Sequence, residues 1–175
     1  EQIDDMRAMA IDHHGGAHGV ANNGGLRAGK SWLYEGGIRE PLVIRWPGRV
    51  KPGKVTDVPV SSVDFLPTLL DIAGLPPSPQ PADGADLRPL LEKGRDPRAR
   101  ALYWYYPSVT AGWKNRMAAA VRLGDLKLIH FFTDGRDELY DLRRDPSEKL
   151  NLAGKRPGTV RDLTRRLTAW ETAMD

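Results

Sequence analysis

The pattern that most constrains the fold lies in the second half of the chain, where four short apolar runs precede a helical one. The four runs are rich in aliphatic and aromatic residues and span Ala101–Tyr106, Met117–Leu123, Leu126–Phe132 and Glu138–Leu142. Gly124-Asp125 separates the second run from the third and is a two-residue hairpin signal. Apolar residues then recur at helical intervals, at Val160, Leu163, Leu167, Trp170 and Met174. The pattern predicts a small antiparallel sheet with an amphipathic helix, Thr159 to Met174, packed on it.

The first half of the chain carries weaker signals. Its first thirty residues are polar and rich in glycine, which is typical of loop. The apolar run Ile38–Trp46 predicts a buried strand that the turn signal Pro47-Gly48 closes. Ser61 to Ala73 predicts a helix with Ser61 or Ser62 as N-cap and Gly74 as C-cap, and it places Val63, Leu66, Leu70 and Ala73 on one face.

A proline-rich connector, Pro76 to Pro81, follows the predicted helix. Pro and Gly interrupt regular elements, so a subdomain boundary is expected between Pro76 and Arg100. The chain is therefore divided into residues 1–90 and residues 91–175.

Composition excludes several classes of function. Of the 175 residues, 40% are hydrophobic and 28% are charged, which is ordinary for a soluble globular protein of one medium domain or for the tail of a larger one. The formal net charge is only +3 and the basic residues are scattered among acidic ones, so no nucleic-acid footprint is expected. No apolar run approaches the ~20 residues of a membrane span. The sequence has no cysteine, which excludes disulfides and thiolate metal sites.

Residues Gly24 to Ser31 match GxxxxGK[ST], the pattern of the phosphate-binding P-loop. A P-loop follows a buried strand and opens a helix whose N-terminus faces the phosphates. Here the preceding residues, HGVANN, do not suit a buried strand, and the residues that follow run directly into Gly36-Gly37. A P-loop nucleotide-binding protein therefore stays an alternative, with an unfavourable context.

The same residues begin a longer string, LRAGKSWLYEGGIREPLVIRWPGRVKPG, from Leu26 to Gly53. It resembles the sulfatase segment written LRGGKGxxYEGGxRxPxxxxWPG. The resemblance continues through SSVDFLPTLLDIAGLP, AVRLGDLKLI and ELYDLRRDPSEKLNLA, in the family's order, and covers most of the chain from Leu26 to Ala153. The chain thus resembles the C-terminal portion of an arylsulfatase-type member of the alkaline-phosphatase superfamily. The resemblance implies an α/β fold: the end of the main domain, followed by the small antiparallel sheet and C-terminal helix.

The resemblance implies that Lys30 is the catalytic, substrate-binding lysine. A compact ammonium on a loop can neutralise sulfate oxygens or the developing charge on the leaving-group oxygen. The neighbouring YEGG residues are expected to be scaffold, with glycines for tight turns and Glu35 paired with Arg39. The substrate implied is a small sulfate ester or a sulfated carbohydrate.

The family's strand before this lysine ends in Asp-Asn-Gly or Asp-His-Gly and binds a divalent cation. The corresponding residues here are Asp12, His13 and His14, followed by Gly15-Gly16, with one residue too many. Either Asp12 and His13 are ligands and the chain bulges at His14, or His13 replaces the aspartate. A carboxylate suits Ca²⁺, or Mg²⁺ as the alternative. Zinc on His13, His14 and His18, or loop histidines without a ligand role, are the other interpretations.

The nucleophile of the family has no counterpart in this sequence. Sulfatases use a formylglycine made within a C/S-x-P-x-R segment, and the chain has no cysteine and no Ser-x-Pro-x-Arg. The chain alone is expected to be inactive. The resemblance also implies a periplasmic or extracellular location. A phosphatase or phosphodiesterase of the same superfamily, and a non-catalytic binding fragment, stay open as alternatives.

Overall fold

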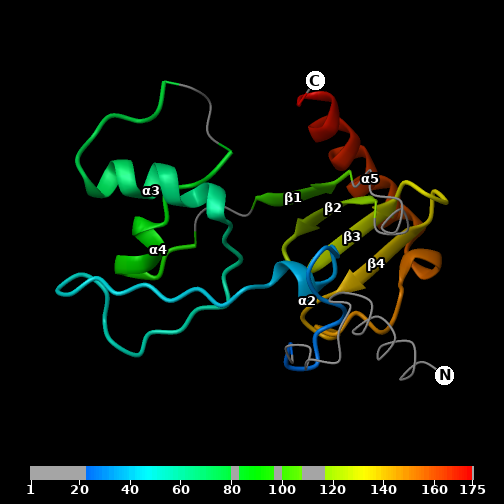
Figure 1. The fold of residues 1–175 in the computed structure, drawn as a ribbon, viewed down its shortest axis with the longest axis horizontal. Coiled ribbons are helices and arrows are strands. Elements are labelled where there is room, and N and C mark those ends of the chain that lie inside the picture. Colours follow the sequence, from blue (N-terminus) through cyan, green and yellow to red (C-terminus); the bar gives the residue numbers. More distant parts are fainter. Residues whose placement is uncertain (1–22, 80–82, 97–99, 108–116, 175) are drawn as a thin grey trace, which may run out of the picture. The chain divides into compact units, whose positions relative to one another are not determined.

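The computed structural model describes residues 23–79, 83–96, 100–107 and 117–174. Four strands, four α-helices and two short 3-10 helices are defined within them (Figure 1). In chain order they are α2 (Glu35–Ile38), η1 (Ser62–Asp64), α3 (Phe65–Ile72), α4 (Arg88–Lys93), β1 (Ala101–Tyr106), β2 (Ala118–Leu123), β3 (Leu126–Phe131), β4 (Asp137–Asp141), η3 (Ala153–Lys155) and α5 (Pro157–Thr172). No helix in these ranges is long and apolar enough to cross a bilayer.

The strands form one antiparallel sheet in the order β1-β2-β3-β4, which confirms the prediction for this part of the chain. Leu123 pairs with Leu126 across the Gly124-Asp125 turn, where Gly124 has a φ of 60°. A positive φ in a two-residue hairpin matches the twist of the flanking strands, which is why glycine stands at this position.

The sheet is covered on both faces. Alternate residues of its strands point to opposite sides, so Ala119, Val121 and Leu128 pack with Leu163 and Leu167 of α5. Ala118, Ala120, Ile129, Phe131 and Tyr140 face the other side and pack with Trp32, Leu33 and Tyr34. The segment just before α2 therefore forms a third layer across the sheet from α5 (Figure 1).

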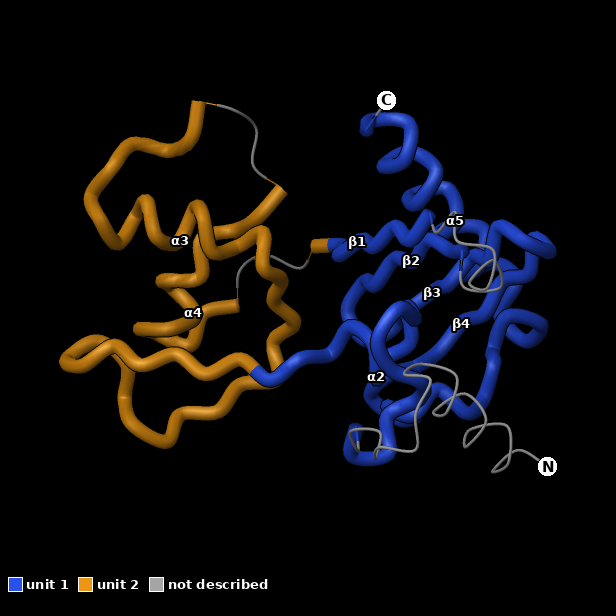
Figure 2. Tube along the Cα trace, in the orientation of Figure 1, with its two compact units in different colours: residues 1–41, 101–175 blue, residues 42–100 orange. Residues whose placement is uncertain are grey.

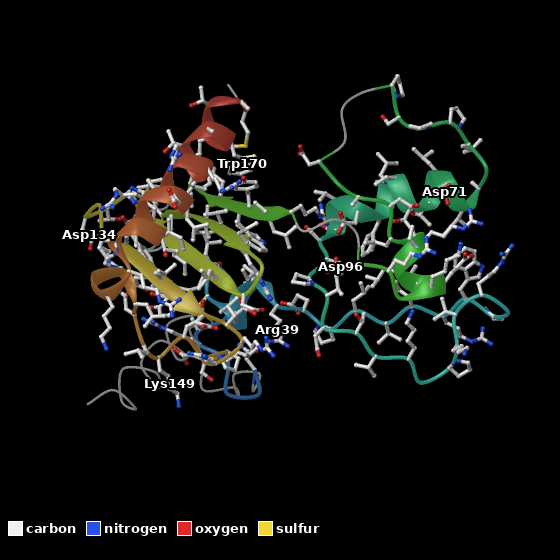
Figure 3. All side chains as sticks on the ribbon, turned by 180° about the vertical axis from the view of Figure 1, so that it is seen from behind. Arg39, Asp71, Asp96, Asp134, Lys149 and Trp170 are labelled. Atoms are coloured by element: carbon white, nitrogen blue, oxygen red, sulfur yellow. The ribbon has the colours of Figure 1, made fainter. Side chains whose placement is uncertain are left out.

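The predicted C-terminal helix is confirmed as α5. Leu163 and Leu167 are buried, and the ring of Trp170 stacks on Tyr103 of β1 with the centroids 4.8 Å apart. Figure 3 shows Trp170 toward the C-terminal end of α5, near β1. Met174 lies beyond the last helical residue and is 51% exposed, so it does not extend the packed face.

The chain divides into two compact units (Figure 2). Unit 1 comprises residues 1–41 and 101–175, and unit 2 comprises residues 42–100. The sheet, α2 and α5 all belong to unit 1, so the segment that carries Lys30 folds with the C-terminal sheet. The predicted division of the chain into domains of residues 1–90 and 91–175 stays a prediction.

Unit 2 contains the predicted helix of residues 61–73 as η1 followed by α3. Ser61 and Asp64 form a capping box, and Gly74 ends the helix with a φ of 67°. The helix buries Asp64, which accepts hydrogen bonds from the amides of Ser61 and Ala85 and pairs with Arg100. The polar side of this helix is therefore its buried side. The predicted apolar face is turned outward, since Leu66 on that face is 55% exposed.

The predicted buried strand Ile38–Trp46 is wrong. Ile38 ends α2, and residues 39–46 adopt no regular structure. Leu42 and Val43 are 45% and 89% exposed. A strand needs a hydrogen-bonded neighbour, and the four strands defined in the described ranges pair only with one another.

Candidate active-site loop

Lys30 lies at the tip of a closed loop, defined here as residues 27–36 and called the lysine loop. The amide of Gly36 donates to the carbonyl of Arg27 at 2.9 Å and closes the loop at its base. The amide of Trp32 donates to the carbonyl of Gly29 at 3.1 Å and makes the turn that presents Lys30. The Lys30 side chain is exposed and forms no hydrogen bond or ion pair with any residue that the structure describes. Lys30 therefore lies on a loop, as expected from the resemblance.

Two glycines make the closed loop sterically accessible. A Cβ added at Gly36 would lie 2.3 Å from the carbonyl oxygen of Arg27, and one added at Gly37 would lie 2.2 Å from that of Trp32. Both clashes are with backbone, which cannot rotate away. Both glycines lie within α2, a helix of four residues, so they form part of this short helix and do not end it. The helix that begins at Glu35 is only about one turn long, so residues 31–35 do not open the long helix that a P-loop requires.

Ala28 and Ser31 flank Lys30 with left-handed backbone. Their φ angles are 58° and 73°. A side chain in this region costs about 1–2 kcal/mol, since Cβ crowds the following carbonyl. The sulfatase pattern LRGGKG has glycine at both positions, so the loop geometry supplies a physical reason for those glycines. Strain of this kind is often found at functional sites.

Arg27 anchors the first end of the lysine loop to the sheet. Its Nη1 donates to the hydroxyl of Tyr140 at 2.8 Å and to the carbonyl of Glu148 at 3.0 Å. Its guanidinium also lies 3.9 Å from the centroid of the Tyr34 ring. The hydroxyls of Tyr34 and Tyr140 both donate to Oε2 of Glu138 at 2.7 Å. Charge-assisted bonds and a cation–π contact thus hold this end in one position.

Glu35 anchors the other end through a buried ion cluster. Its Oε1 accepts from Nζ of Lys127 at 2.9 Å, and the same ammonium lies 2.8 Å from Oε1 of Glu148. The backbone amide of Glu35 donates to Oε2 of Glu148 at 2.6 Å. Nη1 of Arg122 lies 3.8 Å from Oε2 of Glu35. The expected Glu35–Arg39 pair is wrong, because Glu35 points into the sheet.

Burial shifts the ionisation of several groups around the loop. Removal from water raises the pKa of Glu148, and the Lys127 ammonium opposes this shift. Burial also raises the pKa of Tyr34, and the neighbouring Glu138 carboxylate adds to the effect. The pKa of Tyr140 is raised by burial and by its hydrogen bond to Glu138. Both tyrosines therefore stay neutral donors to Glu138 at neutral pH.

The sequence offered one overlooked signal for the ion cluster. Lys127 stands in LKLI, where Leu128 and Ile129 are buried on opposite faces of β3. Lys127 shares the face of Ile129, under the lysine loop, and its side chain is fully buried. A lysine at an inward-facing strand position needs a buried acid as partner. By contrast, the residues around Glu35 and Glu148 form no local pattern that predicts the burial of these two side chains.

The candidate metal ligands Asp12, His13 and His14 lie outside the described residues, as does His18. Within the described ranges, no group of three or more His, Asp or Glu side chains is arranged to hold a metal ion. The calcium site is therefore untested, and no step of the chemistry below is derived through it.

A separate charged hollow lies in unit 1, with a volume of about 570 Å³. It is lined by Asp125, Asp141, Arg143, Arg144 and Arg156. Its lining is polar and mixed in charge, unlike the mostly apolar lining of a typical small-molecule pocket. None of the residues of the lysine loop contributes to it.

Comparison with known proteins assigns the family. The profile of N-sulphoglucosamine sulphohydrolase, C-terminal, matches residues 27–172. Human arylsulfatase A is 39% identical over 170 residues, which cover 83% of this chain and 32% of that protein. An N-acetylglucosamine-6-O-sulfatase of Bacteroides thetaiotaomicron is 38% identical over 130 residues, covering 72% of this chain and 23% of its own. The chain belongs to the sulfatase family and spans a third or less of the length of these relatives.

Solved structures agree with this assignment. The crystal structure of Ps i-CgsB matches with a TM-score of 0.76 at 30% identity, over 86% of this chain and 32% of that one. The structure of BT4656, in complex with its substrate D-glucosamine-2-N,6-O-disulfate, matches with a TM-score of 0.64 at 33% identity, over 74% and 27% of the two chains. The fold is therefore the C-terminal part of the alkaline-phosphatase-like sulfatase fold. The P-loop interpretation is not supported, since no helix opens at Ser31.

Proposed function

We propose that this chain supplies the C-terminal part of a sulfuric ester hydrolase, in which Lys30 binds the sulfate group. The observation that carries the proposal is the lysine loop. Its two ends are fixed to the sheet by Arg27 and Glu35, while the Lys30 ammonium at its tip pairs with no described residue. An ammonium held out by a rigid loop is preorganised for an external anion.

The chemistry of sulfate esters gives Lys30 a definite task. Cleavage leaves negative charge on the sulfate oxygens and on the departing oxygen of the alcohol. A fixed ammonium beside either oxygen stabilises the transition state more than the ground state, which is the condition for faster turnover. The nucleophile would come from the formylglycine of a complete enzyme, because this sequence has no cysteine and no Ser-x-Pro-x-Arg.

We propose a sulfated carbohydrate as the substrate class, with a small sulfate ester as the alternative. The relatives support the carbohydrate: one is an N-acetylglucosamine-6-O-sulfatase, BT4656 binds a glucosamine disulfate, and Ps i-CgsB was solved with k-i-k-neocarrahexaose. The match to arylsulfatase A supports the alternative. The sequence-based expectation of a periplasmic or extracellular location is retained as part of the proposal.

The exposed surface of unit 2 supports a place within a larger fold. Large apolar side chains that a folded domain would normally bury are exposed there: Leu42, Val43, Val55, Leu66 and Leu69. Human arylsulfatase A is about three times as long as the part of it that this chain matches, since 32% of it is covered. We propose that the remaining part of a sulfatase fold covers this surface and provides hydrogen-bonding partners for residues 39–46.

We also propose that Asp12, with His13 or His14, contributes to a calcium site, with magnesium as the alternative. A carboxylate oxygen suits these hard cations. Calorimetric titration of Ca²⁺ into a complete enzyme rebuilt around this chain is expected to give a binding heat that Asp12→Asn weakens strongly and that Asp57→Asn, a change at an exposed residue, leaves intact. Equal heats in both variants would contradict the assignment.

Matched esters test the proposed reaction class. A complete enzyme rebuilt around this chain is expected to hydrolyse p-nitrophenyl sulfate, and a 6-O-sulfated amino sugar faster still. Its kcat/KM on p-nitrophenyl phosphate should be lower than on the sulfate. Preference for the phosphate would assign the chain to a phosphatase or phosphodiesterase of the same superfamily.

A further inference from the structure

The residues that fix the lysine loop converge on Glu148, which lies more than a hundred positions away in the sequence. Its carboxylate accepts from the amide of Glu35 at 2.6 Å, and its carbonyl accepts from Nη1 of Arg27 at 3.0 Å. One residue therefore holds both ends of the loop that carries Lys30. Its backbone is left-handed, with a φ of 53°, which directs carboxylate and carbonyl toward the same loop at the expense of local strain.

Lys127 of β3 links Glu35 and Glu148 on the sheet side of the lysine loop. Its ammonium is fully buried and bridges Oε1 of Glu35 at 2.9 Å and Oε1 of Glu148 at 2.8 Å. Arg122, at 3.8 Å from Glu35, supplies the second positive charge, so two carboxylates face two cations. A buried ion cluster is a poor way to gain stability, because desolvation offsets most of the attraction. Directional bonds between charged groups do, however, select one geometry where apolar packing admits several.

We infer that Lys127 and Glu148 are positioning residues for Lys30. They act by fixing the backbone of the lysine loop at Glu35 and Arg27, so that the ammonium at its tip projects to one place. This inference rests on the proposed function for its catalytic consequence, whereas the fixing of the loop can be measured on the chain itself.

The first experiment measures amide hydrogen exchange by NMR in Lys127→Met, with Lys149→Met as the matched control. Lys149 is exposed, and Figure 3 shows it at the surface of unit 1. Lys127→Met should accelerate exchange at Glu35 and Gly36 by about tenfold or more, with β3 amides such as Leu128 changing by less than about threefold. Lys149→Met should change none of them.

A second variant covers the case in which Lys127→Met does not fold. Glu148→Gln keeps the side-chain shape but has one acceptor oxygen for two donors, and the same local acceleration at Glu35 and Gly36 is expected. Unchanged exchange in a folded variant would overturn the inference. Uniform acceleration of exchange throughout unit 1, or global unfolding of both variants, would also overturn the inference, because the ion cluster would then contribute to stability alone.

The second experiment tests action through Lys30 in the rebuilt enzyme. Lys127→Met should lower kcat on a sulfate ester by about tenfold to a hundredfold when Lys30 is present, since misplacement of about 1 Å has costs of this order. In a Lys30→Ala background the same change should lower kcat by less than about twofold. Equal losses in both backgrounds would overturn the positioning role. If Lys30→Ala alone has no effect, the proposed function fails, while hydrogen exchange still decides whether the cluster fixes the loop.

Discussion

Glycine in place of Ala28 or Ser31, which lie close to Lys30, should stabilise the fold, although glycine in most positions destabilises it. Ala28 and Ser31 have φ angles of 58° and 73°, where the side chain is strained. Ala28→Gly and Ser31→Gly remove a cost of about 1–2 kcal/mol each. Glycine also gives the unfolded chain more conformational freedom, which lowers the free energy of unfolding by about 0.4–1 kcal/mol. A net gain of about 0.5–1 kcal/mol per site is expected.

Urea denaturation followed by circular dichroism measures this gain. With a slope of about 2 kcal/mol per molar urea, in the middle of the usual range for small proteins, each substitution should raise the midpoint by about 0.3–0.5 M. Ala173→Gly is the matched control, because Ala173 has a φ of −80° and carries no strain. There the entropy term acts alone, and the midpoint should fall. If Ala28→Gly and Ser31→Gly lower the midpoint as the control does, the account of strain beside Lys30 is wrong.

Three further predictions concern the loop and its chemistry. Gly36→Ala should cost about 1–3 kcal/mol or more in unfolding free energy, since its Cβ meets the Arg27 carbonyl at 2.3 Å; an unchanged melting temperature would contradict the closed loop. Burial raises the pKa of Tyr34 from its ordinary 10.0, so the folded state disfavours the phenolate and unfolding free energy should fall as pH rises above about 10. Tyr34→Phe should remove part of this fall, and an identical pH profile in the variant would argue against a buried Tyr34. The chain alone, given an aryl sulfate and excess calcium, should show no turnover, and activity that Lys30→Ala abolishes would require a different nucleophile.

The elements with local signals were predictable from the sequence. Alternating apolar runs and the Gly124-Asp125 turn specify the sheet, because pairing across a two-residue hairpin needs no distant information. The helical spacing of Leu163 and Leu167 likewise specifies the inner face of α5. The loop position of Lys30 followed from the resemblance to the sulfatase segment, whereas the backbone carbonyls that require Gly36 and Gly37 could not be named in advance.

The failures share a physical cause, which is dependence on distant partners. Residues 39–46 have the composition of a strand, but a strand forms only where a neighbour offers hydrogen bonds. The partners of Glu35 come from β3 and from the loop after β4, so a pairing with nearby Arg39 could not anticipate them. Burial of charge at Lys127 could be inferred only from the register of β3.

Turnover of Lys30 variants tests the central claim most directly. In the rebuilt enzyme, Lys30→Ala should lower kcat on a sulfate ester by orders of magnitude, because one charge contact in a dry site contributes roughly 3–4 kcal/mol to transition-state stabilisation. Lys51→Ala, at another exposed lysine, should leave kcat unchanged within about twofold, and both variants should unfold at the wild-type temperature. Equal kcat values for the wild type and a folded Lys30→Ala variant would contradict the assignment of Lys30 to the sulfate group.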